Sequence, residues 1–188
     1  DQGAMVRQIG YSPKEFAQIM IDKEGGVDNA KKLFDKSELK PSDYNPEDVR
    51  INSAGEKYSK ILNSVFEEGY DFSDYNRASS IYWPGNRLGH GREDVARFWN
   101  SLKNIFTEIK FSIEHVGYLD EPNKNPRASI RWFLEGIHSN DSDDYGKKTN
   151  SNLFIMGINH VELNKDGIIR EWVLFDEVAI WKQILMNK

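Results

Sequence analysis

The stretch GINHVELNKDGIIREWVLFDEVAIWKQ, residues 157–183, decides how this chain folds. It holds two apolar-rich runs joined by a turn at Asn164-Lys165-Asp166-Gly167, whose Asp-Gly pair supplies the positive φ that a tight hairpin needs. The second run alternates, so its side chains divide between two strand faces. One face carries Ile168, Arg170, Trp172, Leu174 and Asp176; the other carries Ile169, Glu171, Val173 and Phe175. Asp176 therefore lies either at the wet end of the strand or inside an apolar pocket.

Length and composition set the broad class of the protein. The chain has 188 residues, enough for one well-packed domain and little more. Its net charge of −5 gives no attraction for phosphate backbones, so we expect no nucleic acid partner. The absence of Cys excludes disulfides, zinc–thiolate sites and a thiol nucleophile. Aromatic residues at 12%, five of them Trp, indicate a core or pocket rich in flat side chains.

The sequence gives little information about the cellular compartment of the protein. No apolar run approaches about 18 residues, so we expect no membrane span. We expect a cytoplasmic protein. A secreted or periplasmic location stays open, because the sequence starts at Asp1 and not at Met.

Helical signals occupy the first part of the chain. Ser12-Pro13-Lys14-Glu15 is typical of a capping box that starts a helix, which Gly25-Gly26 would end. We predict further helices at Val27 to Phe34, Ser53 to Glu68 and Arg92 to Phe106. We expect three non-strand segments between and before them: a loose end at 1–10, a loop at 37–50 and a short helical turn within 71–79.

Strand patterns follow. Alternation predicts strands in 110–118, 128–138, 153–163 and 168–175, with a brief extended run at 81–83 and a last helix from Val178 to Leu185. Residues 139–152 are polar and charge-dense, so we expect a long solvated loop. Helices first and then about four long strands predict an α+β fold, in which a strongly bent antiparallel sheet packs on helices.

Three segments carry a resemblance to a known family. They are Gly91-Arg92-Glu93-Asp94-Val95 with Phe98-Trp99, the run RWFLEGIH at 131–138, and residues 157–183. In order and spacing they resemble the SnoaL-like polyketide cyclase family, within the nuclear-transport-factor-2-like superfamily. The resemblance covers about Ser53 to Leu185. It implies a cone-shaped curved sheet wrapped around helices with a deep pocket, in a domain of residues 51–188 that follows an N-terminal helical extension of residues 1–50. It also implies a homodimer formed through the sheet.

The resemblance further implies site residues. In enzymes of the family the Asp of the last strand is the general acid/base of a ring closure, and that Asp matches Asp176. His138 matches the histidine that would donate to a carbonyl oxygen. A carboxylate in an apolar pocket has a raised pKa and accepts a proton from a carbon acid more readily. A nearby neutral donor can stabilise the enolate, so we expect no cofactor and no metal. The cluster at Asp141, Asp143 and Asp144 is typical of an exposed acidic loop.

Four residues are candidates for ligand binding, and most candidates have a structural alternative. Trp83, Trp132 and Trp172 would form flat walls around a small apolar molecule. His160 alternates with Met156 and Ile158 and is either part of that surface or a half-buried structural residue. Trp132 and Trp172 are equally compatible with a core role. Asp176 is also a favourable N-cap for the last helix, and His138 is also compatible with a solvated strand end.

Two functions from different classes remain. The first is a cofactor-independent cyclase or isomerase that acts on a small apolar carbonyl compound. The second is a non-catalytic domain that binds a hydrophobic ligand or serves as an oligomer scaffold. The enzyme requires at least two titratable groups that converge on one position in a cavity.

Overall fold

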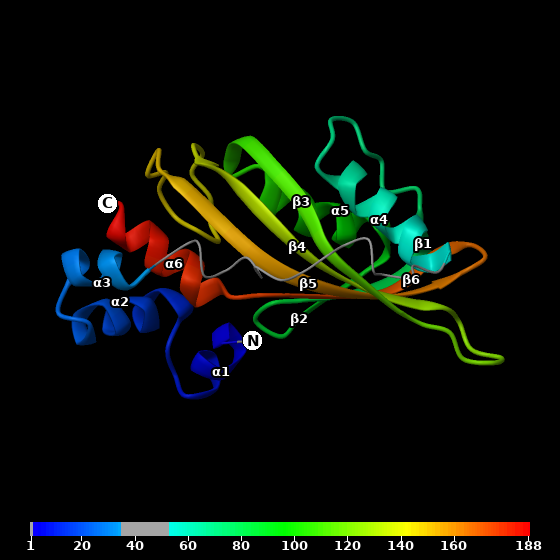
Figure 1. Cartoon of the computed structure of the whole chain (residues 1–188), viewed down its shortest axis with the longest axis horizontal. Coiled ribbons are helices and arrows are strands. Elements are labelled where there is room, and N and C mark those ends of the chain that lie inside the picture. The colour runs from blue at the N-terminus through cyan, green and yellow to red at the C-terminus, as the bar shows by residue number, and fades with distance from the viewer. Residues whose placement is uncertain (1, 35–52) are drawn as a thin grey trace.

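The computed structural model describes residues 2–34 and 53–188, and it shows a six-stranded sheet with helices on one face and at one end (Figure 1). The strands lie in the order β2-β1-β6-β5-β4-β3. Their bounds are β1 Tyr75–Trp83, β2 Arg87–His90, β3 Phe106–Leu119, β4 Arg127–His138, β5 Asn152–Asn164 and β6 Gly167–Phe175. The helices are α1 Gln2–Gln8, α2 Pro13–Lys23, α3 Val27–Leu33, α4 Ser53–Val65, α5 Gly91–Lys103 and α6 Glu177–Met186.

The sheet is mixed. Strands β3 to β6 form an antiparallel meander, and β1 pairs antiparallel with β2. The β5–β6 hairpin turns where the sequence predicted it, with Asn164 opposite Gly167, whose φ is +117°. However, β1 pairs parallel with β6, so the prediction of an antiparallel sheet holds for every neighbouring pair but this one. The α+β class and the curved sheet packed on helices are confirmed.

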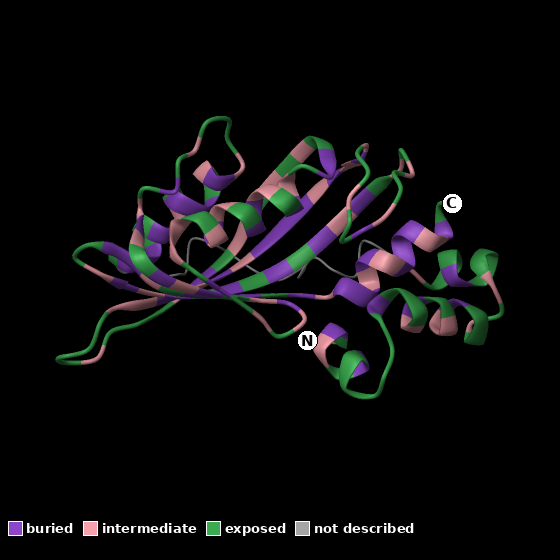
Figure 2. Ribbon diagram, turned by 180° about the vertical axis from the view of Figure 1, so that it is seen from behind, coloured by how far each residue is buried: buried purple, intermediate pink, exposed green. Residues whose placement is uncertain are grey.

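The main core lies between the sheet and the two helices α4 and α5. Strand residues facing these helices are buried, whereas the ends of the long hairpins are exposed (Figure 2). On β6 the inner row is Glu171, Val173 and Phe175, and the outer row includes Trp172 and Leu174. From Arg170 onward the strand faces predicted by alternation are correct, and the face that carries Trp172 points away from α4 and α5. Ile168 was predicted on that same face but is buried in the core, because the β5–β6 pairing shifts register between Glu162 and Leu163. No helix of the described residues is long and apolar enough to cross a bilayer.

The N-terminal helices gather with α6 at one end of the sheet (Figure 1). The predicted capping box is confirmed, since the Ser12 side chain accepts from the Glu15 N–H while the Glu15 carboxylate accepts from the Ser12 N–H. The predicted loose end at 1–10 is wrong: α1 forms there because Val6 is buried against Ala17 and Val178.

One other local prediction needs correction, one short strand was not predicted, and two predictions cannot be compared with the structure. Residues 75–79 belong to β1 and not to a helical turn, because parallel pairing with β6 extends the strand. The segment 87–90 forms the short strand β2. The predicted loop at 37–50 and the predicted domain boundary at residue 50 both lie outside the described residues, so the boundary stays a prediction.

Candidate functional site

A buried carboxyl group, that of Glu171 on β6, lies in the core between the sheet and the helices. It accepts hydrogen bonds from four neutral side chains that come from four different elements. The donors are the Tyr58 hydroxyl on α4, the Tyr75 hydroxyl on β1 at 3.0 Å, the Trp99 indole on α5 at 3.3 Å and the Asn159 amide on β5 at 2.9 Å. Strand and helix packing therefore converge on this one group.

The direction of the hydrogen bonds around Glu171 can be assigned, because the network includes an indole N–H group that can only donate. The Trp132 indole N–H donates to Asn159 Oδ1 at 2.8 Å, and an indole nitrogen is a donor only. This fixes the amide, so Asn159 Nδ2 faces both Glu171 and the Tyr58 oxygen, the latter at 2.6 Å. Because Tyr58 accepts from Asn159, its own proton points to Glu171. The centre is thus arranged as a set of donors around a carboxylate.

The four donors favour the charged form of Glu171, whereas burial favours its neutral form. Removal from water raises the pKa of Glu171 above its ordinary value, and the hydrogen bonds from Tyr58, Tyr75, Trp99 and Asn159 only partly lower it again. Burial also raises the pKa values of Tyr58 and Tyr75 well above 10, so both phenols stay protonated donors. A carboxyl group with a raised pKa beside neutral phenols is the arrangement in which proton transfer to and from carbon is feasible.

The centre is closed in this structure. Glu171 and the residues around it are fully buried, with no exposed fraction for Tyr58, Tyr75, Trp99, Trp132 or Asn159. The large side chains of α4, α5 and β1 fill the space that the sequence predicted as a pocket between the last strand and the helix after Ser53.

Asp176 acts as the N-cap of α6. Its Oδ1 accepts from the backbone N–H groups of Val178 at 2.9 Å and Ala179 at 3.3 Å, so the capping alternative is confirmed. Partial burial raises the pKa of Asp176, and the two backbone hydrogen bonds lower it in part. Asp176 also lines a small hollow of about 180 Å³ with Phe34, Phe154 and other residues of α6 and β5.

His138 lies at the far end of β4 and does not meet Asp176. Phe175, which precedes Asp176, is opposite Gly157, which in turn is opposite Trp132. His138 is therefore about five residues further along the strand direction than Asp176, or roughly 16 Å. Burial lowers the pKa of His138, and Asp141 offsets part of that effect. The structure does not bring the two predicted catalytic residues together.

Trp132 belongs to the core. It is fully buried, and its ring lies edge-on to those of Trp99 and Phe175 at 6.3 and 6.2 Å. A side chain on Gly157 would overlap the Trp132 ring, so the glycine is what allows the indole to lie across β5. Trp132 thus supports the Glu171 centre through Asn159 and does not line an open pocket.

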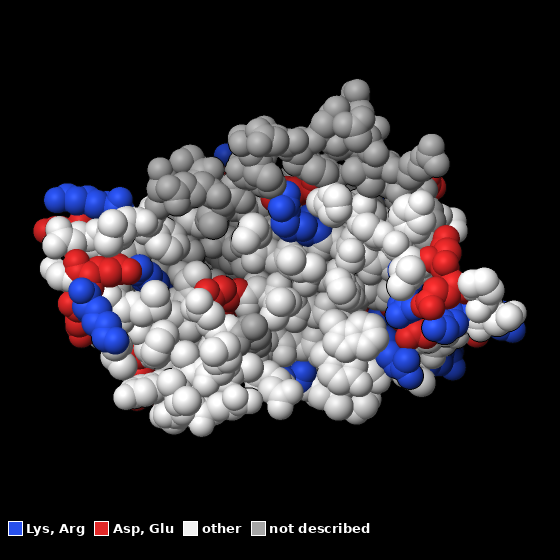
Figure 3. Space-filling model, turned by 60° about the horizontal axis from the view of Figure 1, so that its bottom comes forward, with Lys and Arg blue, Asp and Glu red and all other residues white. Residues whose placement is uncertain are grey.

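The other three predicted ligand residues do line one groove: Trp172 and His160 lie on the outer face of the sheet, whereas the Trp83 ring stacks on Phe98 of α5 at 5.0 Å. Trp83, Trp172 and His160 line a groove of about 780 Å³ between α1 and strands β1, β5 and β6. Figure 3 brings this side of the molecule forward: the middle of the face is mostly uncharged, and charged side chains gather toward its ends. A second hollow, of about 660 Å³, adjoins the groove through His160 and Trp172.

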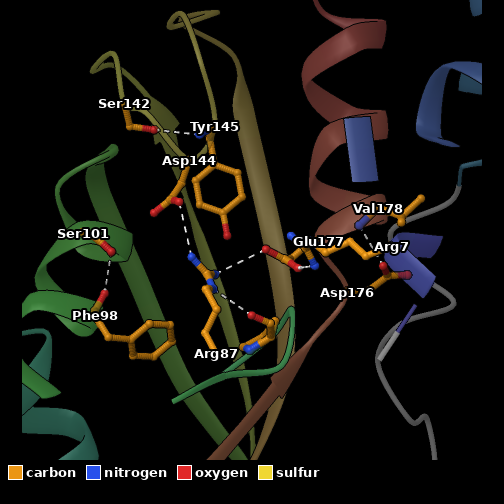
Figure 4. A network of polar contacts seen from close by, with 11 residues as sticks. Arg7, Arg87, Phe98, Ser101, Ser142, Asp144, Tyr145, Asp176, Glu177 and Val178 are labelled. Atoms are coloured by element: carbon orange, nitrogen blue, oxygen red, sulfur yellow. Dashed lines mark hydrogen bonds and ion pairs between the residues drawn. The ribbon is translucent and has the colours of Figure 1, made fainter. Parts of the chain in front are cut away.

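An ion-pair network borders this groove through Arg7 and Arg87 (Figure 4). Glu177, whose side chain is only 7% exposed, pairs with Arg7 at 2.7 Å and with Arg87 at 3.3 Å. Arg87 also reaches Asp144 at 3.3 Å and donates from Nε to the Pro84 carbonyl at 2.8 Å. The network ties α1, the β1–β2 turn, the 139–151 loop and the start of α6 to one another. Among the described residues no three metal-ligating side chains cluster.

The Glu171 centre is the feature that sequence reasoning missed. Alternation had already placed Glu171 in one row with Val173 and Phe175, and an acidic residue in an apolar row is the signal that could have identified it. The family resemblance implied Asp176 instead.

Comparisons with known proteins agree on the fold. Neither protein-family models nor curated proteins match the sequence. Solved structures do. A candidate SnoaL-like polyketide cyclase from Shewanella putrefaciens CN-32 matches with a TM-score of 0.58 and 16% identity over 78% of this chain and 97% of its own. A candidate polyketide cyclase from Acidithiobacillus ferrooxidans matches with a TM-score of 0.57 and 16% identity, over 74% of this chain and all of its own (100%). IdmH, a candidate polyketide cyclase from Streptomyces antibioticus, matches with a TM-score of 0.57 and 12% identity over 71% and 99%. This chain therefore has the fold of the SnoaL-like polyketide cyclases, as the order and spacing of its motifs predicted.

Proposed function

We propose that this protein performs cofactor-independent proton transfer on a small carbonyl compound, as an isomerase or aldol cyclase does, and that Glu171 holds the proton. The observation that carries the proposal is the buried Glu171 carboxyl group, surrounded by two phenols, an indole and an amide. Similarity to candidate polyketide cyclases supports the reaction class.

The chemistry uses groups that already touch. The Glu171 carboxylate would take a proton from the carbon next to a substrate carbonyl, which leaves an enolate and a neutral carboxyl group. Tyr58 or Tyr75 would donate a hydrogen bond to the enolate oxygen, a stabilisation that is strong in a dry site. In an isomerase the carboxyl group returns the proton to another carbon. In an aldol cyclase the enolate carbon attacks a second carbonyl, whose oxygen takes the proton.

The closed core imposes a requirement. A substrate reaches Glu171 only when α4 or α5 moves away from the sheet, since Tyr58 and Trp99 fill the space beside the carboxyl group. We therefore expect amide hydrogens of α4 to exchange faster than those of β4 and β5.

A non-catalytic ligand-binding domain or scaffold is the second candidate. The same closure favours it, because a satisfied buried network can serve only to hold the fold. The outer groove would then be the place where ligands bind.

One experiment separates the two candidates. Aryl ketones and β-keto acids are incubated with the protein in D₂O, and deuterium uptake at the carbon next to the carbonyl is followed by NMR. We expect the wild type to accelerate uptake by at least one compound and Glu171→Gln to fall to the uncatalysed rate. Asp176→Asn is the matched comparison; because Asn is also a good N-cap, it should keep the helix and the activity.

Three results would count against the proposal. The first is uptake at the uncatalysed rate with every compound, which would leave the binding domain. The second is equal activity of the wild type and Glu171→Gln. The third is loss of activity in Asp176→Asn alone, which would return the base role to Asp176. Circular dichroism of each variant checks that loss of activity is not loss of fold.

A further inference from the structure

The outer groove has the size of a small-molecule site. Its volume of about 780 Å³ falls within the range of roughly 300–1,000 Å³ that holds drug-sized ligands. It lies on the opposite face of the sheet from Glu171, because its β6 lining includes Trp172 and Leu174 of the outer row. The inference that follows therefore goes beyond the proposed function.

Two exposed aromatic rings form a stacked pair in the groove. Tyr82 on β1 and Trp172 on β6 are register neighbours, and their rings stack at 5.6 Å with an angle of 9° between planes. They remain 37% and 39% exposed, which is unusual for rings of this size. Ile158 and Leu174 extend the apolar surface beside them. A planar ring system would extend this stack on the free face of the pair.

The charged side chains among the described lining residues are all positive. Arg7 and Arg87 line the groove, whereas no Asp or Glu is among its described lining residues. Glu177 lies behind the two arginines and is nearly buried. Charge-assisted hydrogen bonds to a guanidinium favour a carboxylate ligand.

Arg7 is the arginine with donors to spare. Arg87 uses all three nitrogens, on Pro84, Asp144 and Glu177. Among the described residues Arg7 forms its ion pair through Nη1 alone, and its side chain is 38% exposed. The remaining N–H groups of Arg7 can therefore meet an anion in the groove that the aromatic pair also lines.

We propose that this groove binds a flat polycyclic aromatic carboxylate, with its rings stacked on the free face of the Tyr82–Trp172 pair and its carboxylate at Arg7. The apolar walls select against small inorganic anions, and the guanidinium selects for an acid over a neutral ring compound.

Anthracene-2-carboxylate is a suitable probe, because its fluorescence anisotropy reports binding directly. Anthracene-2-carboxamide has the same rings without the charge. We expect saturable binding of the carboxylate to the full-length protein. Arg7→Gln should weaken that binding about tenfold, as loss of a charge-assisted bond does, and should change binding of the carboxamide less than about twofold. Trp172→Ala should weaken both compounds.

Two controls separate ligand contact from damage to α1. Arg7→Lys keeps a positive charge and should retain most of the preference for the carboxylate. Arg97→Gln changes a 74% exposed arginine on α5 that pairs with Asp94, and it should leave both affinities unchanged. Retained carboxamide binding in Arg7→Gln shows that the groove is intact.

The proposal is overturned by any of three results: no saturable binding of the carboxylate, equal weakening of both compounds by Arg7→Gln, or unchanged binding in Trp172→Ala. The same holds if the protein is dimeric at every concentration tested and takes up neither compound, since a second copy would then be the occupant of this face.

Discussion

At the scale of single residues, Glu171 links the stability of the protein to pH. Its folded-state pKa lies above the ordinary value of 4.5, chiefly because it is buried. The folded state therefore holds this proton more tightly than the unfolded state does. Stability from this group is fully present below pH 4.5 and is lost as the pH rises through the folded pKa. One linked proton changes the free energy of unfolding by up to about 1.4 kcal/mol per pH unit.

Urea unfolding from about pH 4 to pH 8 measures this effect. Other carboxyl groups titrate too, so the quantity of interest is the free energy of unfolding of the wild type minus that of Glu171→Gln. We predict that this difference falls as the pH rises. A difference that is constant, or that grows with pH, would show that the hydrogen bonds outweigh burial at Glu171.

Substitution of Gly157 offers a second test at this scale, because Gly157 leaves room for the Trp132 ring. A Cβ on Gly157 would overlap the buried indole, and the ring has no free space to enter. We predict that Gly157→Ala lowers the free energy of unfolding by about 1–3 kcal/mol, the usual range for overpacking, and also weakens the Glu171 centre through Asn159. Gly117→Ala is the matched control: its Cβ would meet Ser129 Oγ at 2.8 Å, and that hydroxyl can rotate away. Equal losses in the two variants would contradict the role given to Trp132.

The sequence could identify individual residues of the Glu171 centre, but it could not show that they lie next to one another. Alternation along β6 assigns Glu171 to the row of Val173 and Phe175. Its partners Tyr58, Tyr75 and Trp99 are 113, 96 and 72 residues away in the chain. Only the packing of α4, α5 and β1 on the sheet brings them to one carboxyl group, and no local pattern encodes that.

At the scale of elements, the sequence correctly predicted the features that depend only on residues close together in the chain. The Ser12–Glu15 capping box, the Asp166-Gly167 turn and the apolar stripe of α4 each act within a few residues, and each prediction was correct. The start of β1 was missed because YNRASS is mostly polar and becomes a strand by pairing with β6. α1 was missed because its burial depends on α2 and α6.

α1 is held in place by tertiary contacts that can be weakened one at a time. Glu177→Gln removes the negative partner of both Arg7 and Arg87. We predict that α1 then opens more often, so that trypsin cuts after Arg7 about fivefold faster for each 1 kcal/mol lost. Mass spectrometry of early cleavage products gives the rate. Glu162→Gln, which breaks the exposed Arg170 pair on the sheet, should leave this cleavage unchanged. An unaltered rate in Glu177→Gln would mean that Val6 alone holds α1.

At the scale of the whole molecule, one surface has two candidate uses. The sequence predicted a homodimer formed through the sheet, and the outer face does expose large apolar side chains, including Met156, Ile158, Trp172 and Leu174. The proposed ligand groove occupies part of that face. A ligand and a second copy cannot both cover Trp172, so each must reduce the affinity for the other.

We therefore predict that anthracene-2-carboxylate shifts the protein toward monomer in sedimentation equilibrium at concentrations where copies pair. Met156 lies on the outer face but is not part of the groove lining. Met156→Glu should thus abolish pairing, because it places a charge in the apolar contact, while it leaves the probe affinity intact or increases it. If the wild type is monomeric throughout, the predicted homodimer is wrong. If saturating probe leaves the dimer unchanged, copies pair through another surface, and the outer face is free for its ligand at every concentration.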